Sequence, residues 1–214
     1  MSMLPPFLFD GPEDADTTFA FAHGAGVGME SDFMDTIARG LAKKGVRVAR
    51  FEFSYMQKRR EDGKRRPPDR APILLDIWRA VIEGLGRENL FIGGKSMGGR
   101  LASMIAADLE REEAAVKGCI CLGYPFHPPG KPEKLRVEHL ATLETPSLIL
   151  QGTRDSFGTQ EEVSSYELSS KIDIHWLEDG EHNFIPRKKS GRTTMQNWDE
   201  AIEAMLNFMN FTET

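Results

Sequence analysis

Residues 89–100 have the sequence NLFIGGKSMGGR, and the rest of the chain is organised around them. Residues 90–92 form a short apolar run, and the next residues match the pattern G-x-S-x-G from Gly94 to Gly98. An apolar helical spacing follows at once in residues 101–109. A strand, a tight glycine turn carrying a serine, and a helix are the context in which this pattern indicates a nucleophile elbow. The glycines keep Cβ atoms out of the turn, and the N–H groups that begin the helix face developing negative charge.

The same residues allow two other interpretations. Gly94-Lys95-Ser96 resembles the end of the phosphate-binding pattern G-x-x-x-x-G-K-[ST], but the first glycine would stand where the chain has Asn89. The residues between predict a strand and not a phosphate-cradling loop. A glycine-rich turn with an incidental serine is the third interpretation, so the remainder of the chain must decide.

Length and composition restrict the class of protein. The chain has 214 residues, 40% hydrophobic and 28% charged, which predicts a single domain over residues 1–214. The net charge of −6 argues against a generic nucleic-acid or membrane binder. Cys119 and Cys121 are two residues apart in an apolar run, so they share one face of a strand and are poorly placed to bridge each other. We therefore expect a cytoplasmic protein with reduced thiols, a monomer or a homodimer, that binds a small molecule.

Strand and helix patterns alternate about six times along the chain. This alternation predicts a doubly wound, mostly parallel sheet of about six strands with helices on both faces. Ligands of such sheets bind beyond the carboxyl ends of the strands. The expected strands are residues 17–22, 46–53, 90–92, 116–122, 147–151 and 172–177, and the main helices are residues 33–44, 72–85, 97–109 and 197–211.

A base and an orienting group for the serine follow later in the chain. A serine hydroxyl is a weak nucleophile until a base accepts its proton and a third group orients that base. Asp155 follows the strand 147–151, and His182 lies in the loop after the strand 172–177. Asp155 as a helix N-cap and His182 as a solvated loop residue are the plainer alternatives. The order Ser96, Asp155, His182, with each residue just after a strand, favours a catalytic triad.

An oxyanion must also be stabilised. One expected donor is the backbone N–H of Met97, directly after the serine. The other is the N–H of Ala25, in the glycine-rich loop after the first expected strand, with Gly24 or Gly26 as alternative donors. A competing interpretation takes Gly24–Gly28 as a dinucleotide-binding loop, but its spacing is G-x-G-x-G and not G-x-G-x-x-G.

These segments together resemble the α/β-hydrolases, in the small branch related to dienelactone hydrolases. The resemblance implies a minimal α/β-hydrolase fold with a Ser96–His182–Asp155 triad, an oxyanion hole at Ala25 and Met97, and neither a metal nor an organic cofactor. The chain leaves little room for leading antiparallel strands and has no long helical insertion for a lid. A dienelactone hydrolase carries cysteine at the elbow, so its particular reaction is not expected here. The segments that carry the resemblance are residues 23–26, 93–100, 151–155 and 180–184.

A basic segment follows the second expected strand. Residues 58–70 hold seven positive and three negative side chains, a local sum of 7 − 3 = +4. The segment is either a solvated loop or a wall of the site, in which Arg59 and Arg65 bind a carboxylate or phosphate of the substrate. The other residues assigned to substrate binding are His23, Tyr55, Tyr124 and Phe126.

The sequence therefore predicts a serine hydrolase that acts on a small or soluble ester or thioester through an acyl-enzyme on Ser96. The alternatives are a catalytically idle interaction module with the same fold, and a nucleotide-binding protein that uses Gly24–Gly28. Lys95, beside the nucleophile, has no assigned role.

Overall fold

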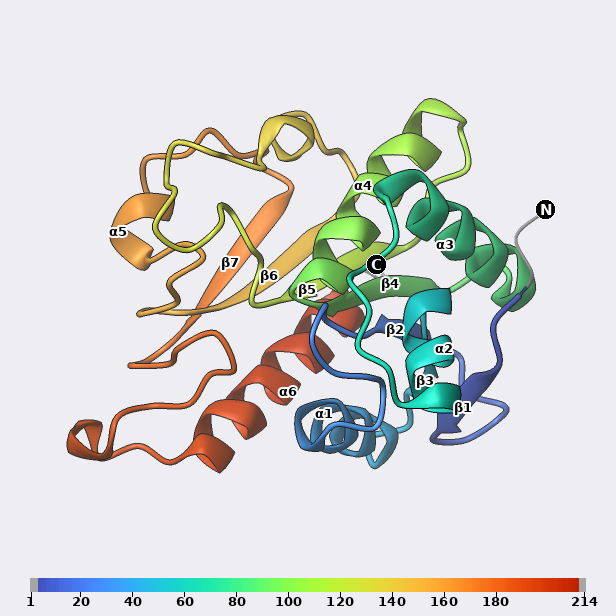
Figure 1. The fold of residues 1–214 in the computed structure, drawn as a ribbon, viewed down its shortest axis with the longest axis horizontal. Helices are drawn as coiled ribbons and strands as arrows, with labels where there is room; N and C mark the ends of the chain where they lie inside the picture. Colours follow the sequence, from blue (N-terminus) through green and yellow to red (C-terminus); the bar gives the residue numbers. More distant parts are fainter. Residues whose placement is uncertain (1–3, 212–214) are drawn as a thin grey trace.

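The computed structural model describes residues 4–211, which form a seven-stranded sheet with helices on both faces (Figure 1). The strand order is β1-β3-β2-β4-β5-β6-β7, and all neighbours are parallel except β1 and β3. The predicted doubly wound, mostly parallel sheet is thus confirmed. The strands are β1 (Phe7–Asp10), β2 (Thr18–Ala22), β3 (Arg47–Phe51), β4 (Leu90–Lys95), β5 (Gly118–Leu122), β6 (Ser147–Gly152) and β7 (Ile172–Leu177).

The strand that the sequence pattern did not predict is β1. It is four residues long and pairs antiparallel with β3, with Phe7 opposite Phe51. At its other end, Asp10 accepts a hydrogen bond of 2.8 Å from the buried Arg50. So short an edge strand depends on this pairing more than on a local pattern. The chain therefore has room for one leading antiparallel strand.

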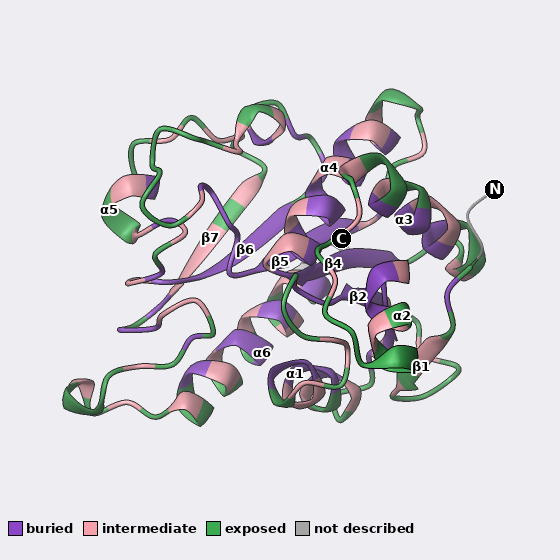
Figure 2. Ribbon diagram, in the orientation of Figure 1, coloured by how far each residue is buried: buried purple, intermediate pink, exposed green. Residues whose placement is uncertain are grey.

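The helices form two layers. The first contains α3 (Ala71–Leu85) and α4 (Met97–Arg111), and the second contains α1 (Asp32–Ala42) and α6 (Thr194–Phe211). Each layer packs its apolar stripe on its own side of the sheet, so the central strands are buried (Figure 2). The shorter helical segments are α2 (Ser54–Asp62), α5 (Gln160–Val163), and the 3-10 turns Glu138–Leu140 and Lys188–Ser190.

The centre of the sheet carries the buried residues that the sequence singled out. All residues of β4, β5 and β6 are buried. Cys119 and Cys121 are free thiols with their sulfurs 3.9 Å apart, which confirms that the two cysteines share one face without bridging. Because β4 lies between β2 and β5, its carboxyl end opens at the middle of the sheet edge. Ser96 follows β4 directly.

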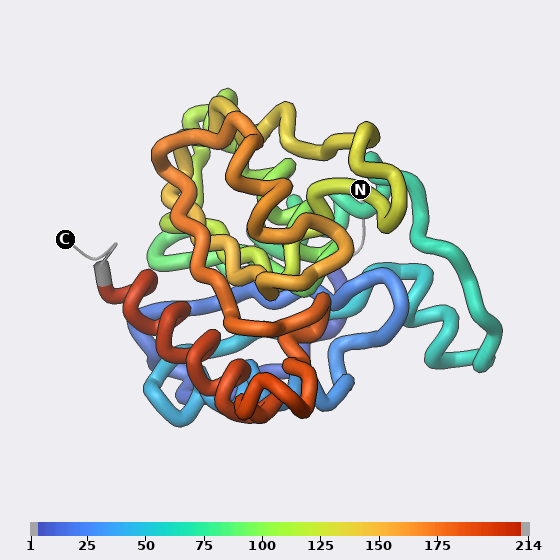
Figure 3. The backbone as a smooth tube through the Cα atoms, turned by 90° about the vertical axis from the view of Figure 1, so that its left-hand side faces the viewer, coloured from blue at the N-terminus to red at the C-terminus, as the bar shows by residue number. Residues whose placement is uncertain are grey.

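The basic segment is partly helical. Its first half belongs to α2, which ends at Gly63 in a left-handed conformation (φ 70°). Residues 63–70 then run along the periphery of the molecule before α3 begins (Figure 3). Among the helices of residues 4–211, none combines the length and the apolar character needed to span a lipid bilayer.

Candidate active site

Ser96 lies at the apex of a strained turn between β4 and α4. Its backbone has φ 52° and ψ −116°, a conformation that a non-glycine residue adopts only when the surrounding structure holds it there. A hydrogen bond of 2.9 Å from Ser96 N to Leu122 O is one such constraint. A Cβ at Gly94 would lie 2.6 Å from Ala22 O, and one at Gly98 would lie 2.6 Å from His23 O. The turn therefore requires both glycines of the motif.

Three side chains meet at this edge of the sheet. His182 Nε2 lies 2.9 Å from Ser96 Oγ, and His182 Nδ1 lies 2.8 Å from Asp155 Oδ2. The histidine side chain keeps 19% of its surface exposed, whereas the aspartate is fully buried. These distances are within hydrogen-bond range, so one imidazole connects a hydroxyl near the surface to a carboxylate in the interior.

Both oxygens of Asp155 accept hydrogen bonds. Oδ1 accepts one from Phe157 N at 2.9 Å, and Oδ2 accepts one from Gln151 Nε2 at 3.1 Å besides that from His182. The alternative role of Asp155 as a helix N-cap is wrong, because Thr159 caps α5. Gln151 is a supporting residue that the sequence argument missed. Its signal was a polar residue that directly follows the apolar residues 148–150 within β6.

His182 is held both at its ring and at its backbone. The Phe157 ring lies against the imidazole, with centroids 4.2 Å apart and an angle of 30° between the planes. On the backbone side, Lys95 Nζ donates a hydrogen bond of 2.6 Å to His182 O. Lys95 is 5% exposed, and its ammonium lies 5.5 Å from the centre of the Phe33 ring. The lysine beside the nucleophile thus points inward and anchors the loop that carries His182.

The burial of Lys95 leads to a prediction about stability. Burial lowers the pKa of Lys95 to about 8, although the charges of Asp155 and Glu181 act in the opposite direction. Between about pH 8 and the unfolded value of 10.5, the unfolded chain then binds more protons at this position than the folded chain, so this group makes stability rise with pH. The unfolding free energy of the wild type minus that of Lys95→Met should rise by about 3 kcal/mol over this range. Chemical denaturation at several pH values measures it, and a difference that stays constant with pH would contradict it.

One predicted oxyanion donor, Met97, follows Ser96 directly, and the other, Ala25, belongs to the loop after β2. A Cβ at Gly24 would be 3.7 Å from Ser96 Cβ, so the loop after β2 runs beside the serine. The backbone N–H groups of Ala25 and Met97 donate no hydrogen bond to any acceptor within residues 4–211. Two unoccupied donors next to a hydroxyl group can bind an oxyanion that forms there.

His23 and Tyr55 support this loop. His23 is fully buried, and its Nδ1 lies 2.6 Å from Gly24 O while its Nε2 accepts a hydrogen bond of 3.2 Å from Phe53 N. Burial lowers the pKa of His23, which suits a neutral ring with one donor and one acceptor. Tyr55 is 2% exposed and its hydroxyl lies 3.3 Å from Ala25 O. Both were assigned to substrate binding, but their burial places them behind the donor loop.

Of the other four residues assigned to substrate binding, three have intramolecular contacts. Tyr124 and Phe126 are fully buried, with ring centroids 4.8 Å apart. Arg59 donates a hydrogen bond of 2.8 Å to Gly26 O. Arg65 is exposed and has no side-chain partner within residues 4–211. Of this group, only Arg65 keeps an exposed side chain that no intramolecular contact occupies.

A second serine–histidine contact occurs farther along α4. Ser103 Oγ lies 2.8 Å from His139 Nε2, but Ser103 is 1% exposed and lies inside the helix. No carboxylate of residues 4–211 bonds to His139. Burial, and then the charge of Arg100, lower the pKa of His139 to about 4. This pair has neither the exposure nor the orienting carboxylate that a nucleophile and its base require.

The glycine loop does not have the features of a dinucleotide site. The carboxylate that would bind a ribose belongs to Glu52, which is 3% exposed and accepts hydrogen bonds from Met29 N at 3.2 Å and from Arg60 Nη2 at 2.8 Å.

Among residues 4–211, no group of three or more His, Cys, Asp or Glu side chains is arranged to hold a metal ion.

A mostly parallel sheet with a serine on a strained strand-to-helix turn defines the α/β-hydrolase class. The chain belongs to this family, because the model of the alpha/beta hydrolase domain matches residues 15–210. It is therefore a member of the α/β-hydrolase superfamily.

Solved structures support the same fold. An alpha-beta serine hydrolase homologue from Coxiella burnetii superposes with a TM-score of 0.68 at 18% identity, covering 94% of this chain and 89% of that one. Dienelactone hydrolase from Anabaena variabilis superposes with a TM-score of 0.66 at 20% identity, covering 93% of this chain and 89% of that one. Est1E from Butyrivibrio proteoclasticus, solved with ferulic acid bound, superposes with a TM-score of 0.68 at 16% identity, covering 96% of this chain and 95% of that one. At these identities the similarity concerns the fold.

Proposed function

We propose that the protein is a serine hydrolase that cleaves a small or soluble carboxylic ester or thioester, with Ser96, His182 and Asp155 as its catalytic triad. The observation that carries the proposal is the continuous hydrogen-bond chain from buried Asp155 through His182 to Ser96. The strained backbone of Ser96 adds to it, because such strain persists where it serves a site.

The reaction follows from the order of the contacts. Ser96 Oγ attacks the carbonyl carbon while His182 Nε2 accepts the hydroxyl proton, and Asp155 stabilises the imidazolium through Nδ1. The N–H groups of Ala25 and Met97 bind the oxyanion of the tetrahedral intermediate. His182 returns the proton to the leaving alcohol or thiol, and an acyl-enzyme remains on Ser96. Water activated by His182 then releases the acid.

The size of the substrate follows from the loops around the site. Between β5 and β6 the chain holds only the 3-10 turn Glu138–Leu140 as helical structure, where larger relatives would carry a lid. We therefore propose that residues 1–214 act as one catalytic unit on small substrates, in the cytoplasm, where the free thiols of Cys119 and Cys121 fit the reducing conditions. A neutral or an anionic substrate is consistent with this proposal.

A fluorophosphonate probe tests the nucleophile directly. The probe should label the protein once, and mass spectrometry of peptides should locate the label at Ser96. Ser103→Ala is the matched control, because it removes the other serine that contacts a histidine, and it should label like the wild type. A label at Ser103 would contradict the assignment. A folded protein that takes up no label would favour the alternative of an interaction module without turnover.

A further inference from the structure

Two half-buried arginines have no anionic partner within residues 4–211. Twelve of the sixteen arginines contact a carboxylate, a carbonyl oxygen or an aromatic ring within residues 4–211. Of the other four, Arg65 and Arg70 are exposed, whereas Arg100 and Arg136 are half-buried. Removing a guanidinium from water without a counter-charge is costly, so the two half-buried cations need an explanation.

Arg100 and Arg136 line the same cavity. It has a volume of about 380 Å³ and lies between α3, α4 and the segment that leads into Glu138–Leu140. Leu75 and Met104 contribute apolar surface to it. Arg100 Nε is shielded from solvent and has no hydrogen-bond acceptor within residues 4–211. The cavity thus combines an apolar wall with two uncompensated guanidinium groups.

The electrostatics of the cavity agree with this geometry. Burial and the neighbouring charge of Arg100 lower the pKa of Arg136. The same arginine contributes to the lowered pKa of His139, which is therefore neutral near pH 7. Two carboxylates also line the cavity, but neither Asp108 nor Glu138 forms an ion pair with either arginine, and Asp108 is paired with Arg111.

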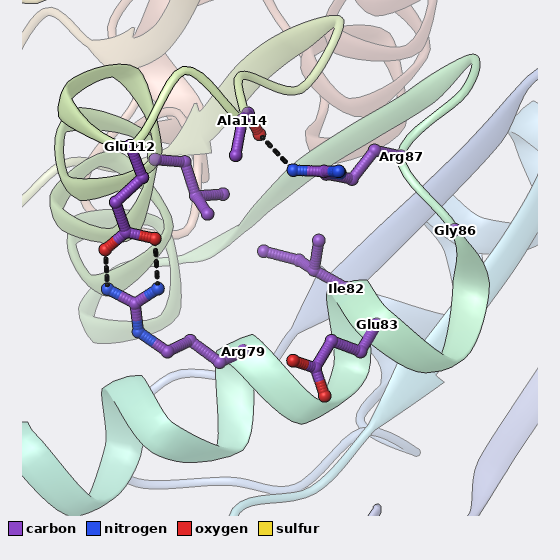
Figure 4. A pocket seen from close by; sticks show the side chains of 8 residues that line it. Arg79, Ile82, Glu83, Gly86, Arg87, Glu112 and Ala114 are labelled. Atoms are coloured by element: carbon purple, nitrogen blue, oxygen red, sulfur yellow. Dashed lines mark hydrogen bonds and ion pairs between the residues drawn. The ribbon is translucent and has the colours of Figure 1, made fainter.

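A larger cavity, also lined by residues of α3 and of the C-terminal part of α4, shows the contrast. It has a volume of about 470 Å³, and its arginines are both engaged (Figure 4). Arg79 forms two hydrogen bonds with Glu112, at 2.8 and 2.7 Å, and Arg87 donates one of 3.4 Å to Ala114 O. That cavity carries no uncompensated guanidinium, whereas the smaller cavity carries those of Arg100 and Arg136.

The position on α4 connects the smaller cavity to the nucleophile. Arg100 follows Ser96 by four residues, which is one helical turn and a rise of about 6 Å. The other residues of α4 that line the cavity follow Arg100 in the chain, so Arg100 is the lining residue of this helix that lies nearest to Ser96 in sequence. Arg136 belongs to the loop after β5, which leaves the sheet at the same edge, and its backbone N donates to Phe126 O at 2.8 Å.

We infer that this cavity binds a carboxylate or phosphate group of the substrate, held between Arg100 and Arg136. The assignment to the substrate rests on the proposed hydrolase function. It moves anion recognition from Arg59 and Arg65 of the basic segment to two arginines on the other side of the serine. Planar guanidinium groups suit such anions because each can donate two parallel hydrogen bonds.

Binding is tested without turnover. Inorganic phosphate should raise the melting temperature of the wild type by roughly 2–4 °C over a chloride solution of equal ionic strength. Arg136→Gln should abolish this difference. Arg39→Gln, which removes a positive charge from the exposed surface of α1, should preserve it. An equal phosphate effect in Arg136→Gln and Arg39→Gln would overturn the site, whether or not Ser96 proves to be the nucleophile.

Kinetics test the assignment to the substrate. Mono-p-nitrophenyl succinate and p-nitrophenyl butyrate share a four-carbon acyl chain and differ in one terminal carboxylate. Arg136→Gln should raise KM for the succinate ester roughly 10- to 100-fold and leave KM for the butyrate ester unchanged. Arg136→Lys, which keeps the charge, should restore part of the loss and covers the case in which the glutamine variant folds poorly. An unchanged ratio of the two KM values, or a selective rise in Arg65→Gln in its place, would overturn the inference.

Discussion

Ser96→Ala is expected to lower kcat on the order of 10⁴- to 10⁶-fold and to leave KM nearly unchanged, because the acyl-enzyme can no longer form. The donors at Ala25 and Met97 and the binding surface remain in the variant, so a small residual rate above that of water should persist. Steady-state hydrolysis of p-nitrophenyl esters measures the loss, with circular dichroism to confirm that the variant folds.

The strained turn provides an independent check on the same position. Because Ser96 has φ 52°, glycine at this position should relieve backbone strain. Ser96→Gly should therefore be as inactive as Ser96→Ala but more resistant to thermal unfolding. If Ser96→Ala kept a tenth or more of the wild-type kcat, the triad would have to be abandoned.

Asp155→Asn is expected to lower kcat on the order of 10⁴-fold while the fold is retained. The reason lies in the contacts of the carboxylate, because Oδ1 accepts from Phe157 N and Oδ2 accepts from both His182 and Gln151. Whichever way the asparagine amide turns, its NH₂ group faces a donor. In one orientation it meets the imidazole N–H, which favours the wrong tautomer of His182.

The matched control for this substitution is Asp173→Asn, which makes the same chemical change at an exposed position of β7. This variant should keep the wild-type kcat. The measurement is kcat for a single ester together with the thermal unfolding of both variants. Equal kcat values for Asp155→Asn and Asp173→Asn would remove Asp155 from the mechanism.

The parts of the fold that sequence predicted best are those with a local pattern. The amphipathic spacing of α3 and the buried run of β4 follow from residues a few positions apart, and the structure has both. The need for glycine at Gly94 and Gly98 could likewise be predicted, because a tight strand-to-helix turn excludes Cβ atoms whatever the rest of the chain does. β1 was missed because four residues give little pattern and its stability comes from pairing with β3.

The burial of the side chains assigned to substrate binding could not be predicted from the sequence. His23, Tyr55, Tyr124 and Phe126 do follow strands at the predicted edge, as the α/β topology requires. Position after a strand indicates the edge, but it does not say whether a side chain turns toward solvent or into the core. These four side chains turn inward, where aromatic rings are stabilised by packing.

Sequence by itself determined the fold class, the family and the order of Ser96, Asp155 and His182, because these depend on local patterns and on where strands end. Only the tertiary structure decided what Lys95 contacts, since its partner, the carbonyl of His182, lies 87 residues away. It also decided that Arg100 and Arg136 share a cavity without a carboxylate partner. The physical reason is the same in both cases: the charge of a side chain can be read from its letter, whereas the loss of water and the choice of partner depend on segments that meet only after folding.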